Sequence, residues 1–100
     1  MLLLRDIYQV KSEHHPITGV MFRGRVRKFC LEQERNVLVE NSERGEEEVY
    51  FAIPAGEDPS EIIQYIETII PSAKIVLAME AIPNPVLSKA KVNDETRYTL

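Results

Sequence analysis

A short segment near the start of the chain, Pro16–Arg23, combines residue types that together could bind an oxyanion. Gly19 allows the backbone to approach a ligand closely, and Thr18 can cap a helix that begins directly after it. A helix start leaves peptide N–H groups without partners at the positive end of the helix dipole, which favours phosphate or carboxylate. Arg23 lies about one turn into that helix, so its guanidinium can return and hold two oxygens. The segment predicts an anion cradle made of the amides of Ile17–Val20 and one arginine.

Simpler explanations exist for this segment and for two other sets of reactive side chains. Short glycine motifs occur often by chance, so the segment could equally be a capped helix start with a surface arginine. Glu13, His14 and His15 suggest a metal site, but adjacent residues of an extended segment point to opposite sides. We interpret them as a solvated loop and assign no metal ligand. Cys30 is expected on the apolar face of a helix, where it acts as a small hydrophobic residue.

Length and composition limit the class of protein. The chain has 100 residues, with 44% hydrophobic, 28% charged and a net charge of −4, which is typical of one globular domain over residues 1–100. The acidic balance argues against nucleic-acid and anionic-membrane surfaces, which need a basic excess. No apolar run is long enough to cross a bilayer, and Met1–Leu4 is too short for a signal peptide. A single cysteine cannot form an internal disulfide, and we expect a cytoplasmic protein.

Hydrophobic periodicity predicts six elements in the order strand, helix, strand, strand, helix, strand. The strands are expected at Leu2–Val10, Arg35–Asn41, Glu47–Ile53 and Ala73–Ala81, and the helices at Val20–Gln33 and Asp58–Ile70. The second helix has a capping Asp58, a proline at its first position and Glu61 three residues after the cap, and it stops before Pro71. Two amphipathic helices on one face of a four-stranded antiparallel sheet make an α+β, ferredoxin-like split βαβ sandwich (βαββαβ).

Finer features of the strands follow from their composition. The first strand is continuously apolar, which predicts a central position in the sheet. The second and third strands form a hairpin, with Gly45 supplying a positive φ in the turn. We interpret the acidic run Glu46–Glu48 as a solvated strand start without chemistry. The segment Val86–Leu100 is expected to form a last edge strand or a docked tail.

Asn41 ends the second expected strand, where this fold can bring it near the loop after the first strand. Its amide can both donate and accept a hydrogen bond, although turn chemistry alone also explains an asparagine at this place. Taken together, Gly19–Arg23 and Val39–Asn41 resemble the acylphosphatase family. That family carries a loop Gly-Arg-Val-Gln-Gly-Val-x-Phe-Arg, then a helix, a strand ending Val-x-Asn, and a turn ending in glycine.

The resemblance extends over most of the chain, from about Val10 to about Ile82. The matching motif residues are Gly19, Val20, Phe22, Arg23, Val39, Asn41 and Gly45. The spacing of 18 positions between Arg23 and Asn41 is common in the family. The segment Pro71–Ile75 after the second helix also resembles the family's entry into its fourth strand.

The resemblance implies hydrolysis of an acyl phosphate to a carboxylate and inorganic phosphate. Arg23 and the loop amides would hold the phosphate, Asn41 would orient the attacking water, and a phosphate oxygen of the substrate would take the proton. This is chemistry by positioning and charge stabilisation. No metal or cofactor is implied, and the expected partners are a small acyl phosphate or inorganic phosphate.

Three loop residues depart from the family pattern, and they leave alternatives open. Pro16 lacks an N–H donor, His15 carries a Cβ where glycine allows close approach, and Thr18 replaces glutamine. A slow enzyme, an altered anion specificity and an inactive domain are all compatible with these changes. The main alternative is a non-catalytic ferredoxin-like domain that binds a small anion or a protein, because this fold hosts many functions. RNA binding is disfavoured, since the neighbouring aromatics Tyr50 and Phe51 must face opposite sides of the sheet.

Overall fold

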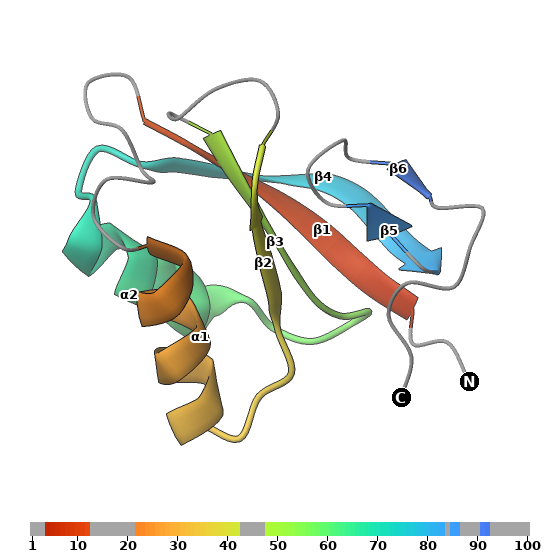
Figure 1. Cartoon of the computed structure of the whole chain (residues 1–100), viewed down its shortest axis with the longest axis horizontal. Helices are drawn as coiled ribbons and strands as arrows, with labels where there is room; N and C mark the ends of the chain where they lie inside the picture. The colour runs from red at the N-terminus through yellow and green to blue at the C-terminus, as the bar shows by residue number, and fades with distance from the viewer. Residues whose placement is uncertain (1–3, 13–21, 43–47, 84, 87–90, 93–100) are drawn as a thin grey trace.

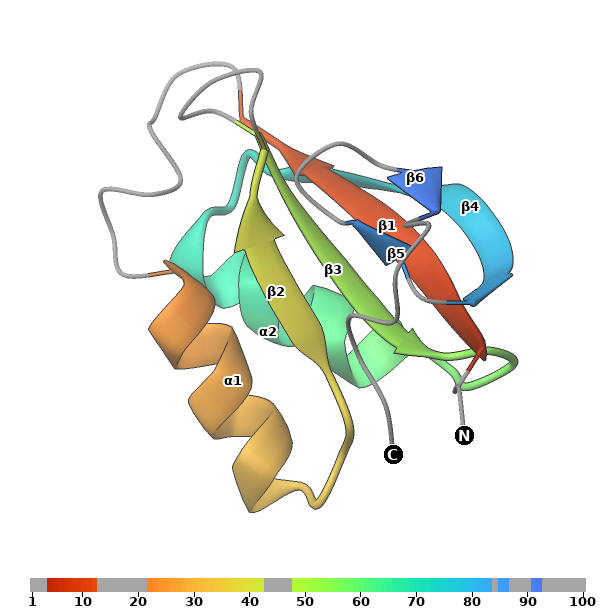
Figure 2. The ribbon, with the colours of Figure 1, turned by 45° about the vertical axis from the view of Figure 1, so that its right-hand side comes forward.

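The computed structural model describes residues 4–12, 22–42, 48–83, 85–86 and 91–92 of the chain. The elements are β1 (Leu4–Lys11), α1 (Phe22–Glu32), β2 (Leu38–Asn41), β3 (Glu48–Pro54), α2 (Ser60–Ile69), β4 (Lys74–Pro83), β5 (Pro85–Val86) and β6 (Lys91–Val92). An antiparallel four-stranded sheet has the order β2-β3-β1-β4, and β5 pairs with β6 separately. Both helices lie on one face of the larger sheet (Figure 1, Figure 2). This is the ferredoxin-like α+β arrangement that the periodicity predicts.

The core lies between the helices and the sheet, and it follows the two-residue alternation of the strands. β3 contributes Val49, Phe51 and Ile53 to this layer, as alternation predicts. The helices contribute their buried residues Phe22, Val26, Cys30, Ile62 and Ile66. Burial raises the pKa of the Cys30 thiol, so the sulfur stays protonated at neutral pH. Cys30 is therefore a core residue, as expected from its place on the helix.

β1 occupies the central position that its apolar sequence predicts. It pairs with β3 on one side and with β4 on the other. Its regular pairing with β3 continues as far as Lys11, which lies opposite Glu48. The sequence predicts an end at Val10 with Lys11 in the loop, so the strand ends one residue later than predicted.

α1 ends in a turn that delays the start of β2. The Arg35 N–H donates to the Cys30 carbonyl at 2.8 Å, and the Glu34 N–H donates to the Leu31 carbonyl at 3.1 Å. These two bonds form a Schellman ending, in which the penultimate residue adopts a left-handed conformation. Glu34 takes this position with φ of 56°. Because these residues complete the helix exit, β2 begins at Leu38 and not at Arg35, where the sequence prediction placed it.

Replacing Glu34 by glycine is expected to stabilise the protein by about 0.5–1 kcal/mol, because glycine adopts positive φ without steric cost. Urea denaturation monitored by circular dichroism measures the change. The matched control is Lys28→Gly, which places glycine at an exposed position in the interior of α1 and is expected to destabilise by about 1 kcal/mol. A loss of stability in Glu34→Gly would contradict the assigned turn.

The start of α2 carries the predicted aspartate cap. Asp58 Oδ1 accepts hydrogen bonds from the Ser60 N–H at 2.9 Å and from the Ser60 hydroxyl at 2.6 Å. Pro59 already has helical dihedral angles, φ −85° and ψ 0°, and its carbonyl accepts the Ile63 N–H. The helix proper is assigned from Ser60, so the difference from the predicted start is one of boundary definition. Donation by the Ser60 hydroxyl, and then by its N–H, lowers the pKa of Asp58.

The lowered pKa of Asp58 predicts a pH-dependent effect of its removal. A carboxyl whose pKa is lower in the folded state stabilises that state above its unfolded pKa of about 3.9, and this contribution is lost as the pH falls through the folded value. Asp58→Ala is therefore expected to lower Tm at pH 7 and to differ less from the wild type near pH 2. Thermal unfolding at both pH values measures the difference, with Glu67→Ala on the same helix as control. An equal Tm difference at both pH values would contradict the prediction.

β4 is an edge strand whose pairing with β1 is interrupted twice. Register shifts occur on either side of Ile7. Ala81 has φ of 50° within this irregular part, and its N–H donates to Asp6 Oδ1 at 2.9 Å. The other oxygen of Asp6 accepts the Gly56 N–H at 3.0 Å. Such bulges increase twist and interrupt a sheet edge, and β4 continues past the irregularity to Pro83, two residues beyond the predicted end.

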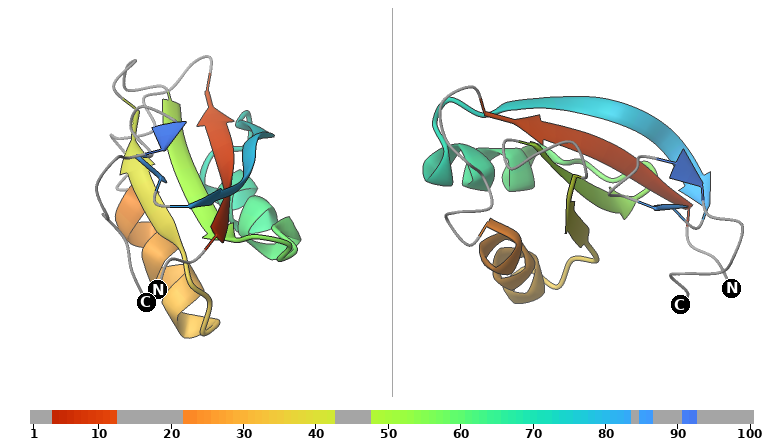
Figure 3. Two further views of the ribbon diagram at one scale, coloured as in Figure 1. Left: turned by 90° about the vertical axis from the view of Figure 1, so that its right-hand side faces the viewer. Right: turned by 45° about the horizontal axis from the view of Figure 1, so that its top comes forward.

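The face of the sheet away from the helices is also partly covered. Ile7, Tyr50 and Ala52 are buried there, with Met79 and Ile82 packed against them. The small β5–β6 sheet lies on this side (Figure 3). The C-terminal strands β5 and β6 therefore form a separate sheet. They do not add an edge strand to the larger sheet, which is one of the two arrangements that the sequence predicts for this segment.

Candidate functional site

Arg23 lies in the first turn of α1, and its side chain is exposed. α1 and β2 run in opposite directions, so the start of α1 and the end of β2 are at the same end of the molecule (Figure 1, Figure 2). A hydrogen bond ties the helix to the strand: Arg27 Nη2 donates to the Val39 carbonyl oxygen at 2.9 Å. The helix side that carries Arg27 therefore faces β2.

Asn41 is the last residue of β2 and lies on the helix side of the sheet. It pairs with Val49 of β3, while Val39 pairs with Phe51, and all three of these apolar partners belong to the core beneath the helices. Residues two apart in a strand share a face, so Asn41 shares the face of Val39. The side chain is half-buried. The Asn41 side chain therefore faces the layer of the molecule in which α1 lies.

The contact between Arg27 and Val39 predicts that Arg23 lies level with Asn41. Residues four apart in a helix share one side and are about 6 Å apart along its axis. Residues two apart in a strand are separated by about 6.6 Å. The two elements run in opposite directions, so going back from Arg27 to Arg23 along α1 leads the same way as going on along β2. The distance is about that from Val39 to Asn41. We infer that Arg23 and Asn41 lie beside each other at one rim of the sheet.

The Asn41 carboxamide has an acceptor that the described residues leave unused. Its Oδ1 is buried, and no hydrogen-bond donor reaches it from the part of the chain that the structure describes. Buried carbonyl oxygens almost always accept a hydrogen bond, and an unsatisfied one costs about 1–3 kcal/mol. The described residues therefore leave this oxygen with the capacity to accept a further hydrogen bond, as a water-orienting role requires.

The electrostatics of α1 favour an anion at its start. The first turn carries Arg23 and Arg25 and contains no acidic residue, and the last turn of this described helix contains no basic residue. Positive side chains at the N-terminus of a helix lie unfavourably against its dipole. An oxyanion bound there would interact favourably with both the dipole and the arginine.

The remaining residues of the predicted site lie outside the described part of the chain. This concerns the cradle residues Ile17, Thr18, Gly19 and Val20. His14 and His15 of the expected solvated loop and the turn residue Gly45 also lie outside it. Within the described ranges, no three His, Cys, Asp or Glu side chains are grouped so that they could hold a metal ion. Likewise, no described helix is long and apolar enough to span a membrane.

Glu48 corrects one of the sequence-based expectations. The acidic run was interpreted as solvated, but Glu48 is only 5% exposed. Its Oε2 accepts hydrogen bonds from the Ser42 hydroxyl at 2.6 Å and from the Tyr50 hydroxyl at 3.1 Å. Alternation from Tyr50 places Glu48 on the sheet face away from the helices, where Tyr50 is buried too. The two-residue spacing between Glu48 and Tyr50 indicates in the sequence that they share a face. The burial of side chains on the face away from the helices was not expected.

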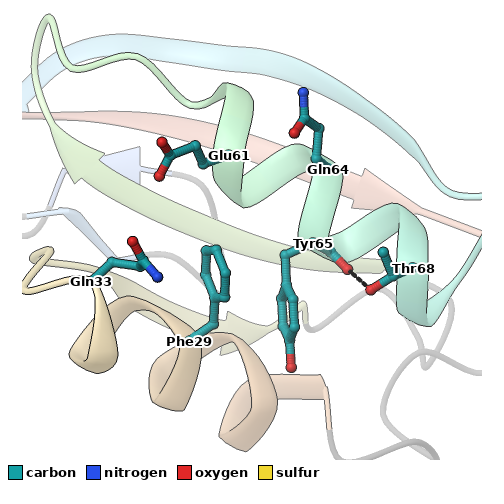
Figure 4. Close-up of a pocket in the computed structure, with 6 residues that line it drawn as sticks. All are labelled: Phe29, Gln33, Glu61, Gln64, Tyr65 and Thr68. Carbon is teal, nitrogen blue, oxygen red and sulfur yellow. Dashed lines mark hydrogen bonds between the residues drawn. The ribbon is translucent and has the colours of Figure 1, made fainter.

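A groove between the two helices offers a different kind of surface. It has a volume of about 370 Å³ and is lined by Phe29, Gln33, Glu61, Gln64, Tyr65 and Thr68 (Figure 4). Phe29 and Tyr65 stack with their ring centroids 4.4 Å apart. The charged residue of this lining is an acid, Glu61, so the groove is unsuited to an anion. Arg23 and Asn41, both described, are not among the residues that line it.

No protein-family model, curated protein or solved structure matches this chain. Its function is therefore inferred from its own residues and from their arrangement.

Proposed function

We propose that the protein hydrolyses acyl phosphates, with Arg23 and Asn41 as the two catalytic side chains. The observation that carries the proposal is the carboxamide of Asn41, whose buried oxygen has no donor among the described residues. It lies on the helix side of the sheet, and the Arg27–Val39 bond supports a position level with Arg23. The proposal therefore combines an anion-binding group and a water-orienting group at one rim of the sheet.

Each side chain has a distinct role in the proposed reaction. The guanidinium of Arg23 and the amides of Ile17–Val20 hold the oxygens of the phosphate group, and they stabilise the charge that develops on them. Asn41 accepts a hydrogen bond from a water molecule and holds it in line with the phosphorus–oxygen bond to the acyl group. The water oxygen bonds to phosphorus as that bond breaks, and the carboxylate leaves with the electron pair.

The proton of the attacking water needs no protein base in this scheme. It passes to an oxygen of the phosphate group, and the products are a carboxylate and inorganic phosphate. The carboxylate is a good leaving group, so the reaction depends mainly on positioning and charge stabilisation. A site with one arginine, one asparagine and backbone amides is therefore sufficient, and the scheme uses no metal or cofactor.

Hydrolysis of benzoyl phosphate by the purified protein tests the proposal. We expect a rate well above that of the buffer, competitive inhibition by inorganic phosphate, and no loss of rate with EDTA. Phenyl phosphate, whose leaving group is much less activated, is the matched control substrate and should be hydrolysed far more slowly.

A rate for benzoyl phosphate equal to that of the buffer would reject the enzyme. Saturable phosphate binding at Arg23 without turnover would then support the alternative, a non-catalytic ferredoxin-like domain that binds a small anion.

A further inference from the structure

A buried carboxylate joins the ends of three strands on the side of the sheet away from the helices. Glu48 Oε1 accepts a hydrogen bond from Gln9 Nε2 at 2.9 Å and lies 3.7 Å from Lys11 Nζ. Its Oε2 accepts from the hydroxyls of Ser42 at 2.6 Å and Tyr50 at 3.1 Å. We call these five residues the Glu48 cluster. A carboxylate this deeply buried is tolerated because several donors and a cation surround it.

The Glu48 cluster lies directly after Asn41, where β2 ends and β3 begins, next to the loop that joins the two strands. The Ser42 N–H donates to the Glu48 carbonyl oxygen at 3.1 Å, in addition to the bond between the two side chains. Glu48 also lies opposite Lys11 in the pairing of β1 with β3. The residue that follows Asn41 is therefore held by one backbone bond and one side-chain bond to the same partner.

The Glu48 cluster and the proposed site lie on opposite faces of the same strand ends. Glu48 and Tyr50 alternate with Val49 and Phe51, which face the helices. Asn41 pairs with Val49 and shares that helix side. Glu48 and Ser42 therefore cannot act on the bound anion directly, and any influence on it passes through the backbone next to Asn41.

Asn41 has particular need of such support. β2 has four residues and lies at the edge of the sheet, and Asn41 is the last of them. The end of a short edge strand is held by few ladder bonds, so it is prone to fraying. Displacement of a positioned group by about 1 Å can lower a rate about 100-fold.

We infer that Ser42 and Glu48 are positioning residues of the site, which set the place of the Asn41 carboxamide through the backbone of β2. This inference rests on the proposed hydrolysis of acyl phosphates. It deepens that proposal, because it assigns a role in the reaction to the buried face opposite the site. The roles of the two residues are separable. The Ser42 hydroxyl donates the hydrogen bond next to Asn41, and the Glu48 carboxylate accepts this bond and is itself held by Gln9.

The experiment measures kcat and KM for benzoyl phosphate in Ser42→Ala and Glu48→Gln. Each variant is expected to lower kcat about tenfold or more, with KM changed less than about twofold, because phosphate binding by Arg23 is untouched. Ser42→Thr keeps the hydroxyl and should restore most of kcat. The matched control is Asp6→Asn, which weakens two backbone contacts at the other end of the sheet, to Gly56 and Ala81.

The control separates positioning from general stability. Asp6→Asn is expected to lower Tm without lowering kcat at 25 °C. An unchanged kcat in folded Ser42→Ala and Glu48→Gln would overturn the inference, and so would an equal fall of kcat in Asp6→Asn. Where Ser42→Ala does not fold, Glu48→Gln and Ser42→Thr decide the outcome.

A second readout keeps this inference apart from the proposed function. In ¹⁵N–¹H spectra, the side-chain amide resonances of Asn41 should shift or broaden in Ser42→Ala and remain unchanged in Asp6→Asn. A wild-type protein that does not hydrolyse benzoyl phosphate would reject the enzyme, while these resonances would still show whether the Glu48 cluster positions Asn41. Unchanged Asn41 resonances in Ser42→Ala would reject the positioning role even in an active enzyme.

Discussion

Arg23→Ala is expected to lower kcat/KM for benzoyl phosphate by about 10³-fold or more, the magnitude associated with loss of an arginine that stabilises a transferring phosphoryl group. The variant removes one of the two arginine side chains of the first turn of α1 and leaves the backbone amides in place. Since Arg23 is exposed and Phe22 carries the buried contact of this turn, the fold should be retained. Steady-state kinetics with circular dichroism measure both properties.

The matched control for this variant is Arg25→Ala. Arg25 is exposed on the same helix, but two positions away, where its side chain projects in a different direction. We expect Arg25→Ala to change kcat/KM less than about fivefold through the general field of the helix start. Equal losses in the two variants would mean that charge alone matters, and retention of the wild-type rate in Arg23→Ala would remove Arg23 from the site.

Asn41→Ala is expected to lower kcat by about 10²–10³-fold, the range found when a positioned amide is removed from an active site. Phosphate binding should be nearly unchanged, because the proposed anion contacts come from Arg23 and the amides of Ile17–Val20. The two variants therefore differ in kind: Arg23→Ala weakens anion binding and turnover, while Asn41→Ala weakens turnover alone. Isothermal titration with phosphate, combined with single-turnover kinetics, separates the two effects.

Asn36→Ala serves as the control for the loss of an asparagine. Asn36 Oδ1 accepts a hydrogen bond from Arg5 Nη2 at 3.2 Å, away from the end of β2. This variant should lose some stability and keep its kcat. A kcat for Asn41→Ala within a factor of two of the wild type would exclude the water-orienting role of Asn41.

Much of the fold could be predicted from the sequence because its signals are local. Alternation in β3 assigns Val49 and Phe51 to the core face without knowledge of the partner strands, and the structure confirms it. The Asp58 cap is also local, since its hydrogen bonds reach only as far as Ser60. The same local signals placed Asn41 at the end of its strand, where the structure finds it.

Features that depend on long-range partners could not be predicted in the same way. Glu48 belongs to an acidic run, and its burial depends on donors outside its own strand, Gln9 of β1 and Ser42 directly after β2. The irregular end of β4 depends on Asp6, which is 75 positions from Ala81. The proposed site is a long-range feature too, because the inferred level of Arg23 against Asn41 rests on the contact of Arg27 with Val39.

A crystal structure of the protein grown with phosphate tests the central claim most directly. We predict a phosphate ion that contacts the amides of residues 17–20 and the guanidinium of Arg23, with a water molecule between the ion and the Asn41 carboxamide. An ion bound elsewhere, with Arg23 directed into solvent and Asn41 turned away from the rim, would contradict it.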